Sequence, residues 1–393
     1  MKNILIMCNI DPNASPRPNR MIRWLKDTYR VTVVGRRAVQ LEGVVDSFVI
    51  IPSGLFGSLI RGNSLPSKIK TFLSRLSMFI RRDYEGLIWA SLSGPRELRD
   101  LLAGRDFDLI ITHDCTLLPL AFSIKGDKAS PVMLDARDYY PRNFDDQLLW
   151  RIFVKPVNQY LCEKYLSLCD KVITVSDGLA REYGQMYRIE PEVVMSMPQA
   201  RALKPVPVRP GVFRMIHHGI VSRSRRLDLM IEMMDYVDER FSLDLMLMGQ
   251  GEYLDRLHAM AARRKNVRIV PPVPLADVVT AINQYDIGVY LLPPTNFNTR
   301  YTLPNKFFEF IQARLALAIG PSIEMKRMLQ EYNCGIVSED FSPRSLARAL
   351  NLLLSEERIM YFKEQSHKAA LKLNAEFNGA RVLQIVGELI EGS

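Results

Sequence analysis

One segment in the last third of the chain places a single carboxylate in an almost wholly apolar helical pattern, one turn after a lysine. In "YTLPNKFFEFIQARLALAIGPS", residues 301–322, Glu309 stands between aromatic and aliphatic residues, and Lys306 precedes it by three positions. A buried carboxylate without partners costs several kcal/mol, so Glu309 is expected to bind something. An exposed pair with Lys306 would contribute only about 0.2–0.5 kcal/mol. The vicinal hydroxyls of a ribose are the alternative, and the residues alone leave both interpretations open.

The start of that helix and an earlier basic loop are candidate anion sites. Thr302 is the expected N-cap and Pro304 suits the first turn, so the free amides behind them would face an anion. Arg223, Arg225 and Arg226 lie in a second loop, between a predicted strand and a helix. Guanidinium groups in such a loop suit a diphosphate. A solvated basic loop is the simpler interpretation.

Glycines and prolines in the same half of the chain allow close backbone approach to a ligand. Gly219 follows the strand that precedes the arginine loop, and Gly249 and Gly251 open a later helix. The second pair is only part of a dinucleotide fingerprint, and a tight turn explains it equally well. The segment 271–274, with three prolines, would hold the chain extended where backbone groups could meet a flat base.

Polar side chains also follow two successive predicted strands in the first half of the chain. His113 and Asp114 come directly after residues 109–112, and Asp135, Arg137 and Asp138 end or follow the strand at 132–135. Such groups could hydrogen-bond a hydroxyl or move its proton. Capping and turn formation are the structural alternatives.

These residues are positioned by short apolar runs that alternate with helical patterns. The alternation predicts an α/β fold of parallel sheets covered by helices on both faces. Strands are predicted at residues 2–8, 31–35, 109–112, 132–135, 172–175, 213–217, 243–248, 267–270, 287–292, 316–319 and 335–337. Helices are predicted at residues 19–28, 117–124, 178–187, 226–234, 252–262, 275–285, 304–314 and 324–331.

The alternation breaks once, in the proline-rich and basic segment 197–213, which is typical of a stiff linker. The chain is therefore predicted to form two doubly wound domains at residues 1–205 and 206–375. A C-terminal helix, residues 376–393, is expected to return to the first domain. Ligands of open α/β sheets bind beyond the carboxyl ends of the strands, so the functional residues are expected in a cleft between the domains.

Composition excludes several classes of protein. The 393 residues are 48% hydrophobic and 24% charged, which is ordinary globular composition. The five cysteines and five histidines show no metal-ligand spacing, so no metal site is predicted. The net charge of +9 favours anionic partners, but no basic stripe interleaved with aromatics supports nucleic acid. Reduced thiols and a first apolar run too short for a signal peptide indicate a cytoplasmic protein.

The positive charge is concentrated in residues 61–82, "RGNSLPSKIKTFLSRLSMFIRR", which hold six basic residues and no acidic one. Their apolar residues fall at helical spacing. This pattern is typical of a basic amphipathic helix on an anionic membrane surface. A surface helix packed on its own domain is the alternative.

Several segments, in order, resemble retaining glycosyltransferases of the GT-B type. "CDKVITVSDGLAREYG", "HHGIVSRSRRLDLMIEMM", "LMGQGEYLDRL", "VPLADVVTAINQYDIGVYLLPP" and "LPNKFFEFIQARLALAIG" with "NCGIV" are similar to landmarks of the large family four. That family includes sucrose synthases and many bacterial polysaccharide and lipopolysaccharide transferases. The resemblance implies GT-B architecture, with two Rossmann-like domains facing a cleft.

The resemblance also implies roles for individual residues. Glu309 would bind the donor ribose and Arg225 the donor diphosphate. The family's first glutamate is replaced by Tyr301 and its other arginine by Ile220, so Arg223, Arg226 or Lys306 would have to compensate. The other donor-side residues would be Gly219, Gly249, Val273, Thr302, Leu303 and Asn305.

In the first domain, "NIDPNASPRPNRMIRWL" resembles an aspartate–proline–arginine variant of the family's first loop. His113 and Asp138 are expected to contact the transferred sugar or the acceptor hydroxyl, and with Arg225 they form the predicted catalytic set. The predicted acceptor-side residues are Asp11, Arg17, Arg20, Asp114 and Arg137.

The predicted reaction moves a sugar from a nucleotide diphosphate to a hydroxyl of a glycan or lipid-linked acceptor, with retention. It needs no cofactor or obligatory metal. Its expected setting is bacterial surface polysaccharide synthesis, at the inner face of the cytoplasmic membrane, with residues 61–82 on the lipid. A nucleotide-sugar 2-epimerase and a non-catalytic nucleotide-sugar-binding partner are the alternatives.

Overall fold

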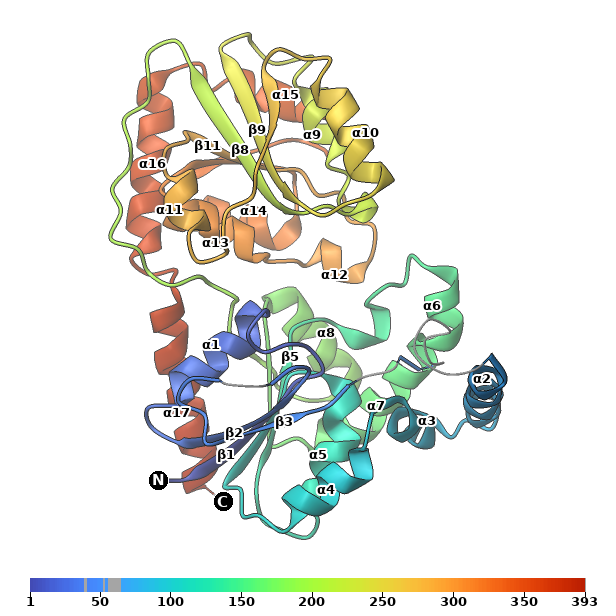
Figure 1. Cartoon of the computed structure of the whole chain (residues 1–393). Coiled ribbons are helices and arrows are strands. Elements are labelled where there is room, and N and C mark those ends of the chain that lie inside the picture. Colours follow the sequence, from blue (N-terminus) through green and yellow to red (C-terminus); the bar gives the residue numbers. More distant parts are fainter. Residues whose placement is uncertain (39–40, 52–53, 56–64, 393) are drawn as a thin grey trace. The chain divides into compact units, whose positions relative to one another are not determined.

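The computed structural model describes residues 1–38, 41–51, 54–55 and 65–392. The chain forms two compact units (Figure 1). Unit 1 comprises Met1–Val194 with Gly379–Ser393, and unit 2 comprises Met195–Asn378. Each unit is an α/β structure around one parallel sheet.

Unit 1 contains a seven-stranded sheet in the order β3-β2-β1-β4-β5-β6-β7. Its strands, all parallel, are β1 (Asn3–Met7), β2 (Arg30–Gly35), β3 (Asp46–Val49), β4 (Leu109–Thr112), β5 (Val132–Ala136), β6 (Lys171–Thr174) and β7 (Glu192–Val193). Apart from Asn3 and Thr112, the residues of β1 and β4 are apolar and buried, because helices cover both faces of a doubly wound sheet. The register places Met7 beside Thr112, so the loops after β1 and β4 leave the sheet together.

The helices of unit 1 connect successive strands, as parallel pairing requires. They are α1 (Pro16–Leu25), α2 (Leu65–Ile80), α3 (Tyr84–Ser91), α4 (Pro95–Ala103), α5 (Leu118–Lys125), α6 (Leu148–Phe153), α7 (Lys155–Tyr165) and α8 (Asp177–Tyr187), with short 3₁₀ turns at Cys115–Leu117, Tyr140–Arg142 and Leu166–Leu168. The last helix of the chain, α17 (Ala375–Glu391), joins this unit. Its Val382, Ile385 and Val386 are buried against the strands near α1.

Unit 2 contains a six-stranded sheet in the order β10-β9-β8-β11-β12-β13, again wholly parallel. Its strands are β8 (Phe213–Ile220), β9 (Phe241–Met248), β10 (Val267–Val270), β11 (Ile287–Tyr290), β12 (Ala316–Ile319) and β13 (Gly335–Val337). Its helices are α9 (Asp228–Met233), α10 (Glu252–Ala261), α11 (Val278–Ile282), α12 (Phe297–Arg300), α13 (Asn305–Gln312), α14 (Ile323–Tyr332), α15 (Pro343–Asn351) and α16 (Glu356–Ala370), with a 3₁₀ turn at Arg223–Arg225.

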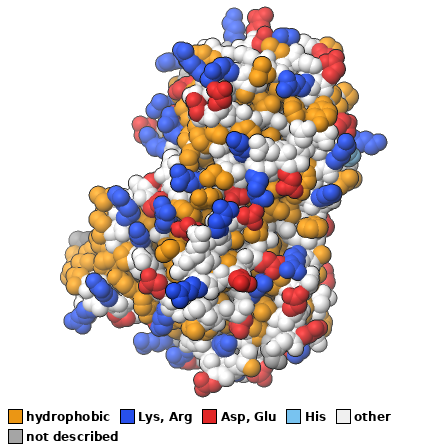
Figure 2. Space-filling view, turned by 180° about the vertical axis from the view of Figure 1, so that it is seen from behind, with side chains coloured by type: hydrophobic (Ala, Val, Ile, Leu, Met, Phe, Trp, Pro, Cys, Tyr) orange, Lys and Arg blue, Asp and Glu red, His pale blue; other side chains and the backbone are white. Residues whose placement is uncertain are grey.

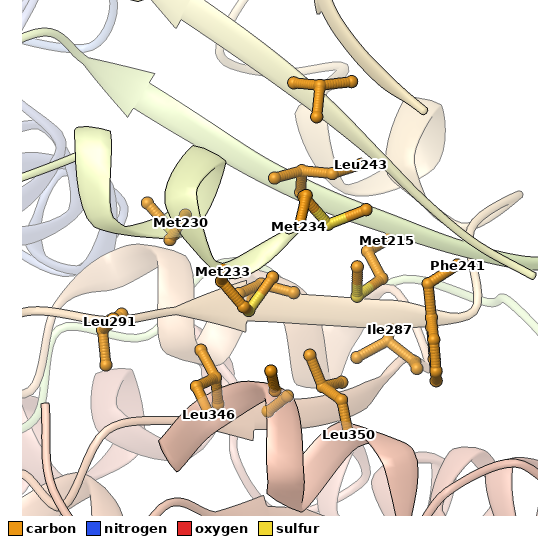
Figure 3. Packing of buried hydrophobic residues seen from close by; sticks show 14 of the residues in the cluster. Met215, Met230, Met233, Met234, Phe241, Leu243, Ile287, Leu291, Leu346 and Leu350 are labelled. Carbon is orange, nitrogen blue, oxygen red and sulfur yellow. The ribbon is translucent and has the colours of Figure 1, made fainter. Parts of the chain in front are cut away.

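The sheet of unit 2 separates two apolar cores. On one face, Met230 and Met233 of α9 lie with Leu346 and Leu350 of α15 over the strands (Figure 3). On the other face, the phenylalanines of α13 pack with residues of α11 and α14. The helix that carries Lys306 and Glu309 is therefore fixed by its apolar side chains.

The proline-rich segment predicted as a linker belongs to unit 2. Met197 is fully buried in the core beside α13. The Arg314 guanidinium donates to the Arg201 carbonyl at 2.7 Å and to the Leu203 carbonyl at 3.2 Å, and Gln312 Oε1 accepts from the Arg201 amide. The boundary between the units thus lies at residues 194 and 195 rather than at 205 and 206, because these contacts attach the extended segment to α13.

Two elements differ from the predicted boundaries at the site. Helix α13 begins at Asn305, and Pro304 occupies its N-cap position without a side-chain cap, so Thr302 is not the N-cap. Asn296 instead caps the short helix α12 through a reciprocal bond with Thr299, which the sequence reasoning missed. No helix among the described residues has the length and apolar character needed to cross a membrane.

Candidate functional site

The centre of the unit 2 site is the amine of Lys306, at the start of α13. The residue is buried, and its Nζ has no hydrogen-bond partner in the part of the chain that the structure describes. This Nζ lies 4.9 Å from the ring centre of Tyr290, the last residue of β11. Burial and the charge of Arg225 lower the pKa of Lys306 to about 7, and Glu309 opposes that shift. An anion that bound beside this buried amine would stabilise its charged form and satisfy its hydrogen-bond donors.

Gly219, at the carboxyl end of β8, determines how closely the backbone approaches that amine. Its φ of +134° lies in a region that side chains rarely adopt. A Cβ at this position would lie 2.6 Å from Nζ of Lys306 and 3.7 Å from Nη1 of Arg225. Two cationic side chains from different elements therefore meet beside one glycine.

Arg225 is the arginine of its loop that joins Lys306. Its Nη1 donates to the carbonyl of Ile220 at 3.3 Å, and the side chain is half-buried. Arg223 instead forms an exposed pair with Glu252 at 2.7 Å, and Arg226 binds Asp228 through two nitrogens. The three arginines of the sequence motif thus point to different partners.

Glu309 lies in the second turn of α13 beside His218, which directly precedes Gly219 in β8. Glu309 Oε2 is 3.3 Å from His218 Nε2, although the geometry is not that of a hydrogen bond. Burial and the charge of Lys306 lower the pKa of His218 to about 3, so its imidazole is neutral at physiological pH. Glu309 is buried, as the sequence predicted from its apolar neighbours.

The adjacent His217 was also missed as a site residue. Its Nδ1 lies 2.8 Å from the carbonyl of Val289, its ring stacks on Tyr290, and its Nε2 is buried without a hydrogen-bond partner among the described residues. Burial and Lys306 lower the pKa of His217 well below its ordinary value. A pair of histidines at the end of an apolar strand is the signal that could have identified both residues.

The remaining predicted donor-side residues all belong to unit 2 and differ in burial. Gly249 has a φ of +148°, and a Cβ there would lie 3.1 Å from Val221, so it closes a tight turn. Leu303 is buried, and Val273 packs on the same core. Thr302 is half-buried, and the Oδ1 atom of Asn305 is buried without a hydrogen-bond partner among the described residues.

In unit 1, the predicted residues His113 and Arg17 meet at Asp135. Arg17 Nε lies 2.7 Å from both carboxylate oxygens of Asp135, and His113 Nδ1 lies 2.8 Å from Oδ2. Burial alone would raise the pKa of Asp135, but the charge of Arg17 and the hydrogen bond from His113 hold it well below its usual range. Arg17, predicted to face a ligand, is itself buried and also donates to the Val194 carbonyl.

This carboxylate orients the His113 ring. With Nδ1 donating to Asp135, the other nitrogen of a neutral ring is an acceptor. That Nε2 is buried and has no hydrogen-bond partner among the described residues. The ring follows β4 at the carboxyl edge of the sheet, where ligands of this fold class bind.

The other predicted residues of unit 1 lie in the loops after β1, β4 and β5. Asp114 caps the turn at Cys115–Leu117 by accepting from Thr116, and Asp11 accepts from the Asn13 amide. Arg137 Nε lies 3.4 Å from Asp138 Oδ2, and burial with the nearby Asp114 raises the pKa of Asp138. Arg20 lies half-buried on α1.

Within the described residues, no group of three or more histidine, cysteine, aspartate or glutamate side chains could hold a metal ion. The prediction of metal-independent chemistry stays a prediction. The predicted cleft between the domains also stays a prediction.

No protein-family profile and no curated protein sequence matches the chain. Several solved structures, in contrast, match the chain. Anabaena HepE in complex with UDP is 12% identical, with 99% of this chain and 100% of that chain covered and a TM-score of 0.70. Trehalose-6-phosphate synthase from Burkholderia multivorans is 13% identical at TM-score 0.70, over 100% of this chain and 98% of that chain.

The chain has the GT-B fold. The alignment with a glycosyltransferase from Rickettsia africae covers 100% of both chains, at a TM-score of 0.68 and 10% identity. The fold predicted from the order of strands and helices is therefore confirmed. At these identities the likeness shows the fold alone.

Proposed function

We propose that this GT-B protein is a glycosyltransferase that takes a sugar from a nucleotide diphosphate sugar. The observation that carries the proposal is the buried Lys306 amine, which has no hydrogen-bond partner among the described residues and lies with Arg225 beside Gly219. Two cations at the carboxyl edge of a parallel sheet suit a diphosphate. HepE of similar fold was solved with UDP and with UDP-glucose, which supports the same class of donor here.

In this proposal, Lys306 and Arg225 stabilise the charge that accumulates on the leaving diphosphate. Electrostatic stabilisation by preorganised groups in a water-poor site is a large catalytic term. Glu309 binds the ribose hydroxyls, and the neutral His218 beside it adds no competing positive charge.

The proposed transfer retains the configuration of the sugar. The bond from the anomeric carbon to the leaving phosphate oxygen breaks as the acceptor oxygen bonds to that carbon on the same face. The acceptor proton passes to the leaving phosphate, so no protein nucleophile is needed. His113 Nε2 accepts a hydrogen bond from a hydroxyl of the sugar or acceptor, and Asp138 contacts the same hydroxyls.

We further propose that the acceptor is a glycan or lipid-linked glycan hydroxyl in bacterial surface polysaccharide synthesis. Catalysis is proposed to need no metal. The proposed partner besides donor and acceptor is the anionic inner face of the cytoplasmic membrane, contacted through residues 61–82.

The experiment that tests this function incubates the protein with UDP-, GDP-, ADP- and TDP-sugars, with and without lipid-linked glycan extracts. Transfer that depends on both substrates, and that Lys306→Met abolishes, supports the proposal. A donor converted to its 2-epimer without an acceptor would show an epimerase instead. Binding without turnover of any donor would show a non-catalytic partner.

A further inference from the structure

Two helices of unit 1, α2 and the shorter α6, leave large apolar side chains in solvent. The exposed fractions of these side chains run from 37% to 71%. On α2 they are Ile69, Phe72, Leu73 and Ile80, and on α6 and just before it they are Phe144, Leu148, Leu149 and Ile152. These eight side chains are called the apolar face below. Single exposed apolar residues are normal in proteins, but a group of this size on neighbouring helices indicates an interaction surface.

The two helices are joined to each other and to the body of unit 1. The rings of Phe79 on α2 and Phe153 on α6 lie 5.6 Å apart, and Phe79 also packs on Tyr84. Arg75 is buried and donates to the carbonyls of Gly54 and Ala90, so the C-terminal half of α2 is held in place. The packing uses one side of α2 and leaves the apolar face outside.

The charge beside the apolar face is predominantly positive. The chain from residue 61 to 82 holds no acidic residue, and Lys70, Arg81 and Arg82 are exposed on or just after α2. On α6, Arg151 is exposed between Leu149 and Ile152. The nearby acidic residues are Asp145 and Asp146 before α6 and Asp83 directly after Arg82. Figure 2 shows hydrophobic side chains bordered by Lys and Arg on the side of unit 1 where α2 and α6 lie.

We infer that the apolar face binds the surface of an anionic lipid bilayer, with α2 and α6 both entering the headgroup region. Apolar side chains that insert beside basic ones, on helices that lie in the plane of the interface, are the features such binding needs. Each lysine or arginine near an anionic surface increases the binding affinity by about fivefold. The inference deepens and rests on the proposed membrane partner, and it adds α6, which the sequence pattern does not reveal.

The test is flotation of the full chain with vesicles of phosphatidylcholine alone, or mixed with phosphatidylglycerol in roughly equal parts. The expected result is binding to the anionic vesicles that weakens as salt rises. Leu149→Asp on α6 and Leu73→Asp on α2 should each weaken binding at least about tenfold. Arg81→Gln with Arg82→Gln should weaken it about twenty-fivefold.

Leu352→Asp in unit 2 is the matched control, because Leu352 is 68% exposed and Leu149 is 70% exposed. Its binding should equal that of the unchanged protein, and all variants are checked for an unchanged melting temperature. No binding to anionic vesicles would overturn the inference. If Leu149→Asp leaves vesicle binding unchanged, α6 is not part of the membrane-binding surface.

A protein partner or a second copy of the chain gives a different outcome. Light scattering that shows a dimer, reduced to a monomer by Leu149→Asp in the absence of lipid, would overturn the inference in favour of self-association. Because flotation uses no donor, its failure leaves glycosyl transfer standing. A protein that binds vesicles but transfers no sugar would overturn only the proposed function.

Discussion

His113 Nδ1 lies 2.8 Å from Asp135 Oδ2, and the Arg17 guanidinium holds the other side of the same carboxylate. All three groups are buried. A carboxylate with two such partners stays ionised and determines which nitrogen of the imidazole is an acceptor. Arg17 therefore acts on the orientation of His113 through Asp135. Its predicted place on the acceptor side stays a prediction.

Asp135→Asn should destabilise the protein by about 3–5 kcal/mol, because it leaves the Arg17 charge buried without its anion. Urea unfolding at neutral pH measures this change. Asp106→Asn is the control, since Asp106 has a side chain 95% exposed and should change stability by less than about 0.5 kcal/mol. Equal effects of the two substitutions would contradict the assigned role of Asp135.

The same carboxylate should contribute to acid sensitivity. Because the pKa of Asp135 is lower in the folded protein than in the unfolded chain, its contribution is present above about pH 4. It is lost as pH falls toward the folded-state pKa. The free energy of unfolding should therefore decrease below about pH 4, and this decrease should be smaller in Asp135→Asn. An equal decrease in the free energy of unfolding in both proteins would contradict this role of Asp135.

Gly219→Ala should weaken diphosphate binding at least about tenfold, since its Cβ would lie 2.6 Å from the Lys306 amine. Gly211→Ala is a matched control for backbone strain. Gly211 also has a positive φ, of +73°, but no atom lies within 4 Å of its added Cβ. Isothermal titration of both variants checks the prediction, and equal affinities would show that the space beside Lys306 is not used.

Lys306 should make both stability and binding depend on pH. Its folded-state pKa of about 7 is lower than its value in the unfolded chain. Between about pH 7 and pH 10 the unfolded chain holds the proton that the folded protein has released, so stability should rise with pH. Lys306→Met should reduce that rise by roughly 1 kcal/mol or more, as measured by urea unfolding across this range.

Binding of an anion should reverse the shift, because a phosphate beside the amine favours its charged form. Diphosphate binding should then take up protons above about pH 7, and titrations in buffers of different ionisation enthalpy count them. No proton uptake, or equal uptake by Lys306→Met, would count against Lys306 as the anion-binding group.

Gly288→Ala should destabilise unit 2 by about 1–3 kcal/mol. Gly288 lies in β11, and a Cβ there would come within 2.4 Å of the ring of Phe310 on α13. The ring cannot yield without moving the helix that carries Lys306 and Glu309, so diphosphate affinity should fall as well. Gly387→Ala in α17 is the control. A Cβ added to Gly387 would have no atom within 4 Å apart from the backbone of its own helix, so this substitution should be neutral or slightly stabilising.

The fold was predictable because its strands are short apolar runs separated by clear helical patterns. The strands at 109–112, 267–270, 316–319 and 335–337 have the predicted bounds. Strand β3, whose residues are half-buried or exposed, and the two-residue β7 lack that apolar signal. The segment after Val194 was misjudged because its attachment depends on Arg314, which lies more than a hundred residues later.

The candidate site was only partly predictable. Glu309 stood out as a charge among apolar neighbours, and Arg225 stood in a basic loop. Their surroundings depend on contacts between distant strands, which spacing does not reveal. The family resemblance singled out Arg225, but residue type and spacing alone do not distinguish it from Arg223. In the structure Arg225 lies with Lys306 beside Gly219, and Arg223 pairs with Glu252. The stacking of His217 on Tyr290 likewise joins β8 to β11.

Lys306 and Arg225 are proposed to bind a nucleoside diphosphate, and calorimetric titration with UDP, GDP, ADP and TDP measures that binding. We predict saturable binding of at least one of them, weakened about ten- to a hundredfold by Lys306→Met and by Arg225→Met. Arg223→Met, which removes an exposed paired arginine of the same loop, should leave the affinity unchanged. Binding of none of the four, or equal affinity in all three variants, would contradict this proposal.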